Sequence, residues 1–374
     1  MASPQKLQFS LRYSPALDGI RGVAVLAVMT VHAAPASPYT QWGYLGVDVF
    51  FTLSGFLITA VLLQEWSKTG SIDFKNFYAR RALRLLPALS LLLLSSLLPL
   101  NPIPATERVK AALIALFYSV NWFRAFVPDF HMAGLGHTWS LSVEEQFYLL
   151  WPITLVIVLR FESLRKRIVP ILVIAVLACA TYRILLWTAD RTPERLYNGL
   201  DTRADSLLAG CALSAMLAFG VLKPGLAMKK AANLLALGAI PFVLLIFSSE
   251  WNDDFMFLAG YFLVALISAT VIFSVVRSSS PSTSLTRMLS FPPLVWTGQI
   301  SYGLYLWHYP LFLYVRGLGL PMPVAMLGMY GSVFLVASLS FYGVERPFLR
   351  MKQKFKVPEA TPAGVLVATP PAHL

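Results

Sequence analysis

Apolar residues occur along this chain in long runs, which are separated by short segments rich in charged and small residues. A helix that crosses the hydrocarbon core of a bilayer needs about 20 largely apolar residues. Runs of about this length cover residues 20–34, 44–64, 82–100, 140–159, 168–188, 204–222, 231–249, 256–276, 294–315 and 323–344. The pattern therefore predicts an all-α fold, a polytopic integral membrane bundle of about ten transmembrane helices.

A further apolar run, residues 109–123, is shorter and is interrupted by Asn121. Cytoplasmic loops of membrane proteins carry an excess of lysine and arginine. If this run does not cross the membrane, most of the 30 Lys and Arg residues fall on the same side as both termini. We therefore expect both termini and the loops 65–80 and 160–167 to face the cytosol, and 101–138 to form a re-entrant segment on the outer side.

Composition excludes an ordinary soluble protein. Of the 374 residues, 57% are hydrophobic and 13% are charged, with a mean hydropathy of +0.66, whereas soluble domains are about 25% charged. Basic cytoplasmic loops account for the net charge of +12, so we expect no nucleic-acid partner. The sequence predicts one transmembrane domain at 1–350 in the inner (plasma) membrane, in contact with lipid. Residues 351–374 are expected to form a basic, disordered cytoplasmic tail.

The first apolar run carries an arginine near its start and a histidine near its end. Arg21 and His32 are eleven residues apart, which on an α-helix is close to three turns and about 16 Å, so both side chains project from one face. Asp18 joins this face one turn earlier. Ionisable groups at membrane depth are costly and usually functional, so the spacing indicates a transfer route along this helix.

Three arginines, Arg80, Arg81 and Arg84, lie within about one turn at the cytoplasmic start of the third run. Such a cluster can be a topology determinant, as in other cytoplasmic loops. It can also bind an anion, because guanidinium groups fork onto phosphate oxygens. The second interpretation predicts a polyphosphate ligand on the cytosolic side.

Acidic and hydroxyl residues enter two other runs. Asp48 begins the second run just inside the outer boundary and needs a partner. Ser140, Glu144 and Tyr148 are spaced by four in the fourth run and therefore share a helix face. A carboxylate on this face can orient a histidine and support its protonated form.

Further polar residues occur near the other run ends. Arg203 and Asp205 stand at the start of the sixth run, and ion pairing with each other or with Arg183 is the default interpretation. Tyr305 and His308 form part of a polar stripe in the ninth run. Cys179 and Cys211 have no further cysteine or histidine at ligand spacing, so no metal site is expected.

Seven sequence blocks occur in an order typical of one family of membrane enzymes: LDGIRGVAVLAV, GVDVFFTLSGFLI, FYARRALRLLP, HTWSLSVEEQFYLLWP, TRADSLLAG, SYGLYLWHYP and ERP. From about Leu17 to Pro347 the chain resembles the membrane-bound acyltransferase-3 family. The resemblance implies an O-acyltransferase that acts on a carbohydrate or glycosylated acceptor of the cell envelope. It also implies an acyl-CoA donor, expected to be acetyl-CoA, on the cytosolic side.

The resemblance implies a role for individual residues. His32 corresponds to the catalytic histidine, Arg21, Arg81 and Arg84 to functional arginines, and Glu144 to the acidic residue of its block. We expect His32 to act as a general base or as a covalent acyl carrier, with its tautomer set by Glu144 or, as the second choice, by Asp48.

The donor is expected to place its phosphates on Arg80, Arg81 and Arg84 and its pantetheine arm between the first two helices. The residues expected to contact the acceptor are Ser140, Tyr148, Arg203, Asp205, Tyr305 and His308. Some relatives continue into an extracellular hydrolase-like domain, so transfer is expected either directly to the acceptor or through a separate extracellular transfer protein.

A proton-coupled transporter of a sugar-like or anionic solute is the alternative from another functional class. Buried arginine, histidine and acidic residues also occur in such carriers. Carriers often contain inverted repeats, however, and no internal repeat is visible in this sequence. A purely structural scaffold does not explain so many polar residues at membrane depth.

Overall fold

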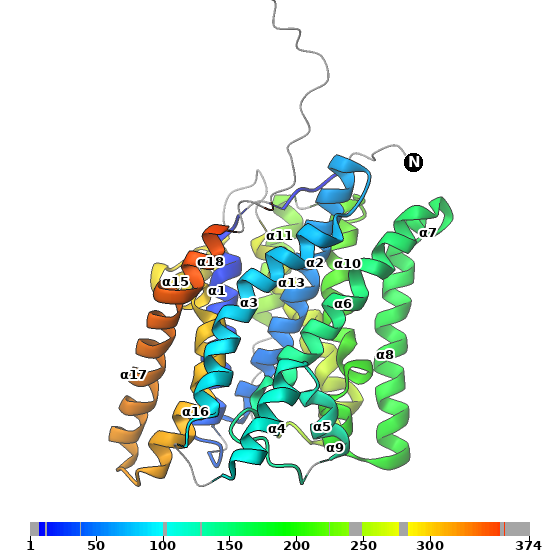
Figure 1. Ribbon diagram of the computed structural model, residues 1–374. Helices are drawn as coiled ribbons and strands as arrows, with labels where there is room; N and C mark the ends of the chain where they lie inside the picture. The colour runs from blue at the N-terminus through cyan, green and yellow to red at the C-terminus, as the bar shows by residue number, and fades with distance from the viewer. Residues whose placement is uncertain are drawn as a thin grey trace, which may run out of the picture.

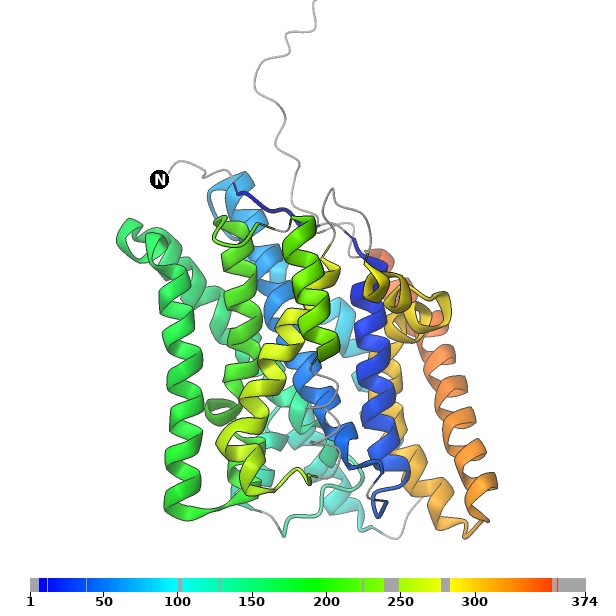
Figure 2. The ribbon, with the colours of Figure 1, turned by 180° about the vertical axis from the view of Figure 1, so that it is seen from behind.

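The computed structural model of the protein is a bundle of α-helices, seen from two sides in Figures 1 and 2. It describes residues 7–11, 13–37, 39–99, 103–127, 129–223, 225–238, 249–276, 283–351 and 355, and within these ranges no residue is in a β-strand. The predicted all-α class is therefore confirmed. The tail predicted at 351–374 lies outside the described residues, apart from Met351 and Phe355.

The helices follow the order of the predicted runs. Their bounds are α1 (Pro15–Ala33), η1 (Gln41–Leu45), α2 (Gly46–Thr69), α3 (Phe74–Ser96), α4 (Ala105–Leu116), α5 (Val120–Phe126), η2 (Gly136–Thr138), α6 (Trp139–Arg160), α7 (Glu162–Lys166), α8 (Ile168–Asp190), α9 (Pro193–Asn198), α10 (Leu200–Ala218), α11 (Leu226–Gly238), η3 (Met256–Gly260), α13 (Tyr261–Val275), α14 (Ser284–Leu289), α15 (Pro292–Gln299), α16 (Ser301–Gly317), α17 (Met322–Ser340), η4 (Phe341–Glu345) and α18 (Arg346–Met351).

Six helical segments among the described residues are long and apolar enough to cross a membrane: Pro15–Ala33, Gln41–Thr69, Gly136–Arg160, Ile168–Asp190, Met256–Val275 and Met322–Met351. The helices α3, α10 and α16 run beside these six in the bundle (Figures 1 and 2). They carry Arg81 and Arg84 on α3, Arg203 and Asp205 on α10, and His308 on α16. The protein is thus a polytopic membrane bundle, and the count of ten crossings stays a prediction.

The two ends of the bundle hold different segments. The end named here the basic end, at the top of Figure 1, holds the start of α1, α7 and α18. The opposite end, named the far end, holds α4, α5 and α9. The helix α4 has 12 residues and α5 has 7, and 12 residues rise only about 18 Å, too little to cross the hydrocarbon core. The segment predicted to be re-entrant therefore stays at one end.

Close approach of helix backbones holds α2 against α10. A Cβ atom on Gly55 would lie 1.9 Å from the carbonyl oxygen of Leu207, and one on Gly210 would lie 2.0 Å from that of Thr52. Small residues permit such contacts. In membranes, where no hydrophobic effect acts between helices, van der Waals packing of this kind drives helix association. The small residues of α2 thus serve helix packing, which brings the polar start of α10 against Asp48.

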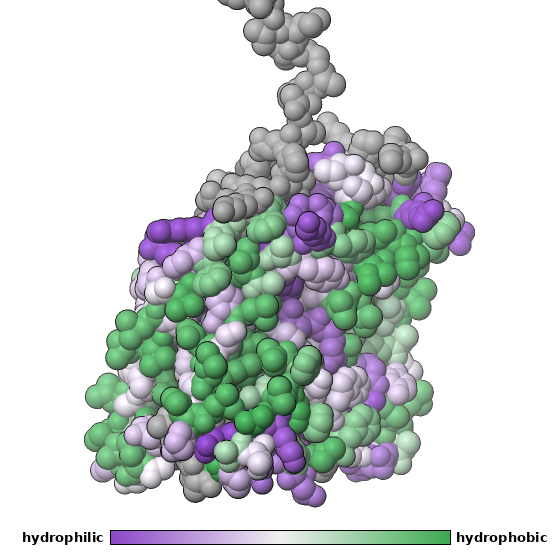
Figure 3. Space-filling view, in the orientation of Figure 1, coloured by the Kyte–Doolittle hydropathy of each residue, from purple (hydrophilic) through white to green (hydrophobic). Residues whose placement is uncertain are grey.

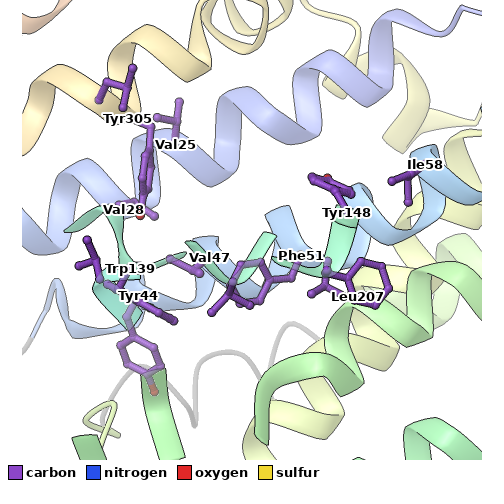
Figure 4. Close-up of a cluster of buried hydrophobic side chains, with 14 of the residues drawn as sticks. Val25, Val28, Tyr44, Val47, Phe51, Ile58, Trp139, Tyr148, Leu207 and Tyr305 are labelled. Atoms are coloured by element: carbon purple, nitrogen blue, oxygen red, sulfur yellow. The ribbon is translucent and has the colours of Figure 1, made fainter. Parts of the chain in front are cut away.

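Apolar side chains from several helices meet around α2 and form the largest buried cluster. Figure 4 shows part of it, with Val25 and Val28 from α1, Val47, Phe51 and Ile58 from α2, Trp139 and Tyr148 from α6, Leu207 from α10 and Tyr305 from α16. Interiors of this kind are close-packed, so their side chains have defined positions. The cluster fixes α1, α6 and α16 relative to one another, and these helices carry the candidate site.

Candidate active site

A cavity of about 250 Å³, named here the arginine cavity, lies between α2, α3, α6 and α16. The predicted site residues among its lining are Arg21, Arg80, Arg81, Arg84, Ser140, Glu144, Tyr148 and Tyr305. Figure 3 shows hydrophilic residues within the otherwise hydrophobic band on the face formed by α3 and α6. Apart from Arg21, the walls come from helices other than α1, so this cavity is not simply a groove between the first two helices. The course of the pantetheine arm stays a prediction.

Three of the four arginines in this cavity pair with a carboxylate of the protein, and Arg80 and Arg81 are the most extensively bound. Arg81 forks onto Glu145 through Nε (3.1 Å to each oxygen) and Nη2 (2.7 Å to Oε1). Its guanidinium carbon also lies 3.2 Å from the centre of the Tyr148 ring. Arg80 pairs with Glu65 at 3.1 Å and donates to the Phe355 carbonyl at 2.7 Å. Their positions are therefore fixed, but much of their hydrogen-bonding capacity is used.

Arg84 differs from its neighbours, because it forms no hydrogen bond or ion pair with the residues that the structure describes. Arg21 faces the same cavity, and its side chain retains 22% exposure while pairing with Asp18 at 2.9 Å. A guanidinium group that lines a cavity without an internal partner is available to an anionic ligand. Arg84, with Arg21 beside the same cavity, is thus the candidate for anion binding in this cluster.

The two carboxylates expected to orient His32 do not contact it. Glu144 accepts a hydrogen bond from Ser54 at 2.6 Å and faces the arginine cavity. Asp48 is fully buried and accepts from Arg203 at 2.6 Å and from Ser206 at 3.1 Å. Both expectations were wrong, because the packing of α2 against α6 and α10 supplies other partners to these two acids.

A second histidine takes the place of the expected acid. His308 Nε2 lies 3.1 Å from His32 Nδ1, and His308 Nδ1 lies 2.6 Å from the Tyr305 carbonyl oxygen. A carbonyl oxygen can only accept, so in neutral His308 the proton is on Nδ1 and Nε2 is the acceptor. Neutral His32 must then donate from Nδ1, which leaves the lone pair of its Nε2 free. This is the tautomer that a general base requires.

His137 is a site residue that the sequence reasoning missed. It is buried, its Nε2 lies 3.1 Å from the Leu306 carbonyl oxygen, and its ring centre lies 5.3 Å from that of His308. Its own carbonyl accepts from Tyr305 at 2.7 Å. The signal was present, since this histidine opens the block that contains Ser140 and Glu144. Glu145 and Ser54, which hold Arg81 and Glu144, were missed as well.

Ser140 and Tyr305 meet at the inner end of the arginine cavity. Their hydroxyl oxygens are 2.5 Å apart, and both residues line the cavity while Tyr305 also contacts His137. The pair therefore lies between the cavity and the three histidines. That Ser140 and Tyr305 contact the acceptor stays a prediction.

Arg203 and Asp205, expected to contact the acceptor, are instead fully buried in ion pairs between helices. Arg203 binds Asp48 at 2.6 Å, and Asp205 binds Arg183 at 2.6 Å. All four side chains are 0% exposed, so a substrate cannot reach them without a large movement. The default interpretation of ion pairing was correct for these residues, although Arg203 and Asp205 pair with other helices and not with each other.

Sequence comparisons with known proteins show the family of this chain. A family model described as an acyltransferase domain (Acyl_transf_3) matches residues 14–343. The peptidoglycan O-acetyltransferase OatA of Listeria monocytogenes is 35% identical over 356 residues, which is 91% of this chain and 56% of that protein. The O-acetyltransferase OatA of Staphylococcus aureus is 33% identical over 368 residues, 93% of this chain and 59% of that protein.

The chain thus spans a little over half the length of these curated relatives. No solved structure matches it. The family model covers most of the chain, including α1, the arginine cavity and the three histidines. The chain belongs to the acyltransferase-3 family of membrane proteins.

Proposed function

We propose that this chain is a membrane O-acetyltransferase that moves an acetyl group from cytosolic acetyl-CoA to a hydroxyl of a cell-wall glycan. The observation that carries the proposal is the geometry of His32, whose Nδ1 is held by His308 and whose Nε2 forms no hydrogen bond with any described residue. Tyr305, whose ring centre lies 5.4 Å from that of His308, lines the cavity that contains the four arginines. The relatives named as peptidoglycan O-acetyltransferases support a peptidoglycan strand as the acceptor.

The donor binds in the arginine cavity with its phosphates at the basic end. Arg84 and Arg21 supply the charge-assisted hydrogen bonds, and Arg80 adds positive charge at the cavity mouth. Apolar side chains such as Phe77 and Leu85 line the same cavity and pack against the pantetheine arm. Glu144 accepts a hydrogen bond from a pantetheine amide, because its carboxylate faces the cavity and is acceptor-only when ionised.

Transfer proceeds by general-base catalysis at His32. The acceptor hydroxyl attacks the thioester carbonyl while its proton moves to His32 Nε2. A C–O bond to the acetyl group forms, the C–S bond breaks, and the imidazolium returns its proton to the departing CoA thiolate. His308 accepts from His32 Nδ1 throughout this sequence and so keeps the reactive nitrogen directed at the substrate.

The test of this function uses the purified chain in lipid nanodiscs with acetyl-CoA and chitotetraose, a soluble β-1,4-linked N-acetylglucosamine oligomer. An acetylated oligosaccharide in the mass spectrum, together with stoichiometric free CoA thiol, is the expected result. Uptake of the sugar into sealed vesicles without release of thiol would instead support the proton-coupled transporter.

Arg84→Ala is expected to raise the KM for acetyl-CoA by about tenfold to one hundredfold, which corresponds to one lost charge-assisted contact of about 1.5–3 kcal/mol. Arg84→Lys should restore only part of the affinity, since an ammonium group cannot fork. Steady-state kinetics with varied acetyl-CoA measure this effect. Arg160→Ala serves as the control, because Arg160 lies outside the cavity lining. An unchanged KM for acetyl-CoA in Arg84→Ala would contradict donor binding and would leave these arginines only as determinants of membrane topology.

The basic end is proposed to face the cytosol, as the distribution of lysine and arginine predicts. Single cysteines at Lys68, Asp129 and Lys166, all of which are exposed, should be labelled from the inside, the outside and the inside, respectively. The experiment needs a background in which Cys179 and Cys211 are replaced. Labelling of position 129 from the cytosol would reverse the proposed orientation or require another crossing.

A further inference from the structure

A second, larger cavity of about 1200 Å³ lies at the far end and is named here the aromatic cavity. The end of α3, the loop before α6, and the helices α5, α9 and α16 form its walls. Binding cavities for small ligands usually measure about 300–1,000 Å³, so several linked sugar rings fit. The proposed mechanism uses the arginine cavity and assigns nothing to this second space.

The lining combines aromatic faces with polar groups that have no internal partner. Trp307, Tyr309 and Tyr314 line it from α16. The carboxylates of Asp129 and Glu194, which also line it, form no hydrogen bond or ion pair with any described residue. The indole Nε1 of Trp307 is buried and likewise has no hydrogen-bond partner among the described residues.

These groups match the chemistry of a carbohydrate. Pyranose rings present C–H faces that pack against aromatic rings by dispersion. Their hydroxyl groups donate to carboxylates and accept from an indole N–H. A lipid acyl chain would leave the buried indole N–H of Trp307 and the partly buried carboxylate of Glu194 without a partner, whereas the exposed carboxylate of Asp129 can still reach water. A desolvated polar group without a partner is costly. The unpartnered polar groups therefore favour a sugar over a lipid tail.

The aromatic cavity adjoins the three histidines through one side chain. The Tyr309 ring centre lies 5.1 Å from that of His32 in an edge-on arrangement and 5.2 Å from that of His137. Tyr305 lies one turn earlier than Tyr309 on the same face of α16, since residues four apart share a helix face. Tyr305 lines the arginine cavity. The histidine pair is thus approached by one cavity from the basic end and by the other from the far end.

We propose that the aromatic cavity is the acceptor site, which binds a glycan chain and presents one sugar hydroxyl to His32 past Tyr309. The proposal rests on the acetyl transfer proposed above and adds the location of the second substrate. Asp129 and Glu194 accept hydrogen bonds from the glycan, Trp307 donates one, and the aromatic rings contact the sugar faces. Arg124, which lines the cavity and donates to the Gly136 carbonyl at 3.1 Å, holds the wall formed by the loop.

Acceptor kinetics of two variants test the site. In Glu194→Gln and Asp129→Asn, the KM for chitotetraose should rise by about tenfold, the effect of one weakened hydrogen bond to a charged group. The KM for acetyl-CoA should change by less than about twofold in both variants, because the donor binds elsewhere. Glu250→Gln is the matched control, since Glu250 is an exposed carboxylate outside the aromatic cavity.

Direct binding supplies a readout that is independent of turnover. Chitotetraose titrated into the full chain in nanodiscs should change the tryptophan fluorescence, and Trp307→Phe should remove most of that change. Phosphatidylglycerol added in place of the sugar tests the lipid alternative. An equal response to the lipid, or an unchanged acceptor KM in both carboxylate variants of an active enzyme, would overturn the acceptor site.

The two proposals fail in different ways. If wild-type protein releases no CoA thiol and acetylates no sugar, the acetyltransferase proposal fails, but saturable sugar binding that depends on Trp307 still locates a glycan site. If the wild type acetylates chitotetraose and the variants at Asp129 and Glu194 keep its acceptor KM, only the location of the acceptor site is wrong.

Discussion

Replacement of His32 by alanine is expected to lower the rate of acetyl transfer by about two orders of magnitude or more, the usual scale for loss of a general base. Acetyl-CoA should still bind with nearly the same affinity, because its anionic groups contact arginines in the separate arginine cavity. Transfer to chitotetraose and binding of acetyl-CoA, measured on the same preparation, distinguish the two effects. An active His32→Ala variant would contradict the mechanism.

His308 provides the control for this prediction. In the proposed mechanism it is a positioning residue, since its Nε2 accepts from His32 Nδ1 while its own Nδ1 donates to the Tyr305 carbonyl. His308→Leu should lower kcat with little change in the KM for acetyl-CoA, and His308→Gln, which retains an acceptor, should recover part of it. The double variant of His32 and His308 should be little worse than His32→Ala alone, because residues that act as a unit are not additive.

Replacement of Asp48 by alanine is expected to destabilise the folded protein by about 3–5 kcal/mol, the usual cost of removing one partner of a buried ion pair. The change leaves the guanidinium of Arg203 uncompensated at 0% exposure. Two further contacts of this guanidinium, with the rings of Tyr261 at 3.8 Å and Tyr197 at 4.9 Å, carry no negative charge that could replace the carboxylate. Thermal unfolding in detergent, followed by circular dichroism, measures the effect.

Two controls separate this effect from a general sensitivity to charge removal. Replacing both partners with Asp48→Leu and Arg203→Met should recover much of the loss, because two apolar groups of similar size leave no buried charge. The pair between Glu162 and Lys166 is largely exposed, so Glu162→Ala should leave the unfolding temperature almost unchanged. An unchanged unfolding temperature of Asp48→Ala, with an increased KM for the acceptor, would contradict the structural role and indicate that Asp48 and Arg203 bind substrate.

The sequence was sufficient to predict the fold class, an all-α polytopic membrane bundle. Long apolar runs must form helices in a bilayer, because every backbone polar group needs a partner within its own segment. The runs at 20–34 and 168–188 correspond to α1 and α8. The short, interrupted run at 109–123 corresponds to the helices α4 and α5, which have 12 and 7 residues and are too short to cross the hydrocarbon core.

The sequence also predicted which side chains share a helix face. Ser140, Glu144 and Tyr148 line one cavity, as their spacing of four requires. Arg21 and His32 both lie on the side of α1 that faces the site, one at the arginine cavity and the other at His308. Contacts of this kind follow from the helical repeat alone.

Partners on different helices were decided only by the tertiary structure. His32 and His308 are 276 residues apart in the chain, and Asp48 and Arg203 are 155 apart. The partner of each buried polar side chain depends on the depth and rotation of the helix that carries it. Depth and rotation follow from the packing of small residues such as Gly55 and Gly210. The sequence therefore determined the helices and the residues on each face. Packing between helices places Glu145 against Arg81 and His308 against His32, and it leaves Arg84 in the cavity without a hydrogen-bond partner among the described residues.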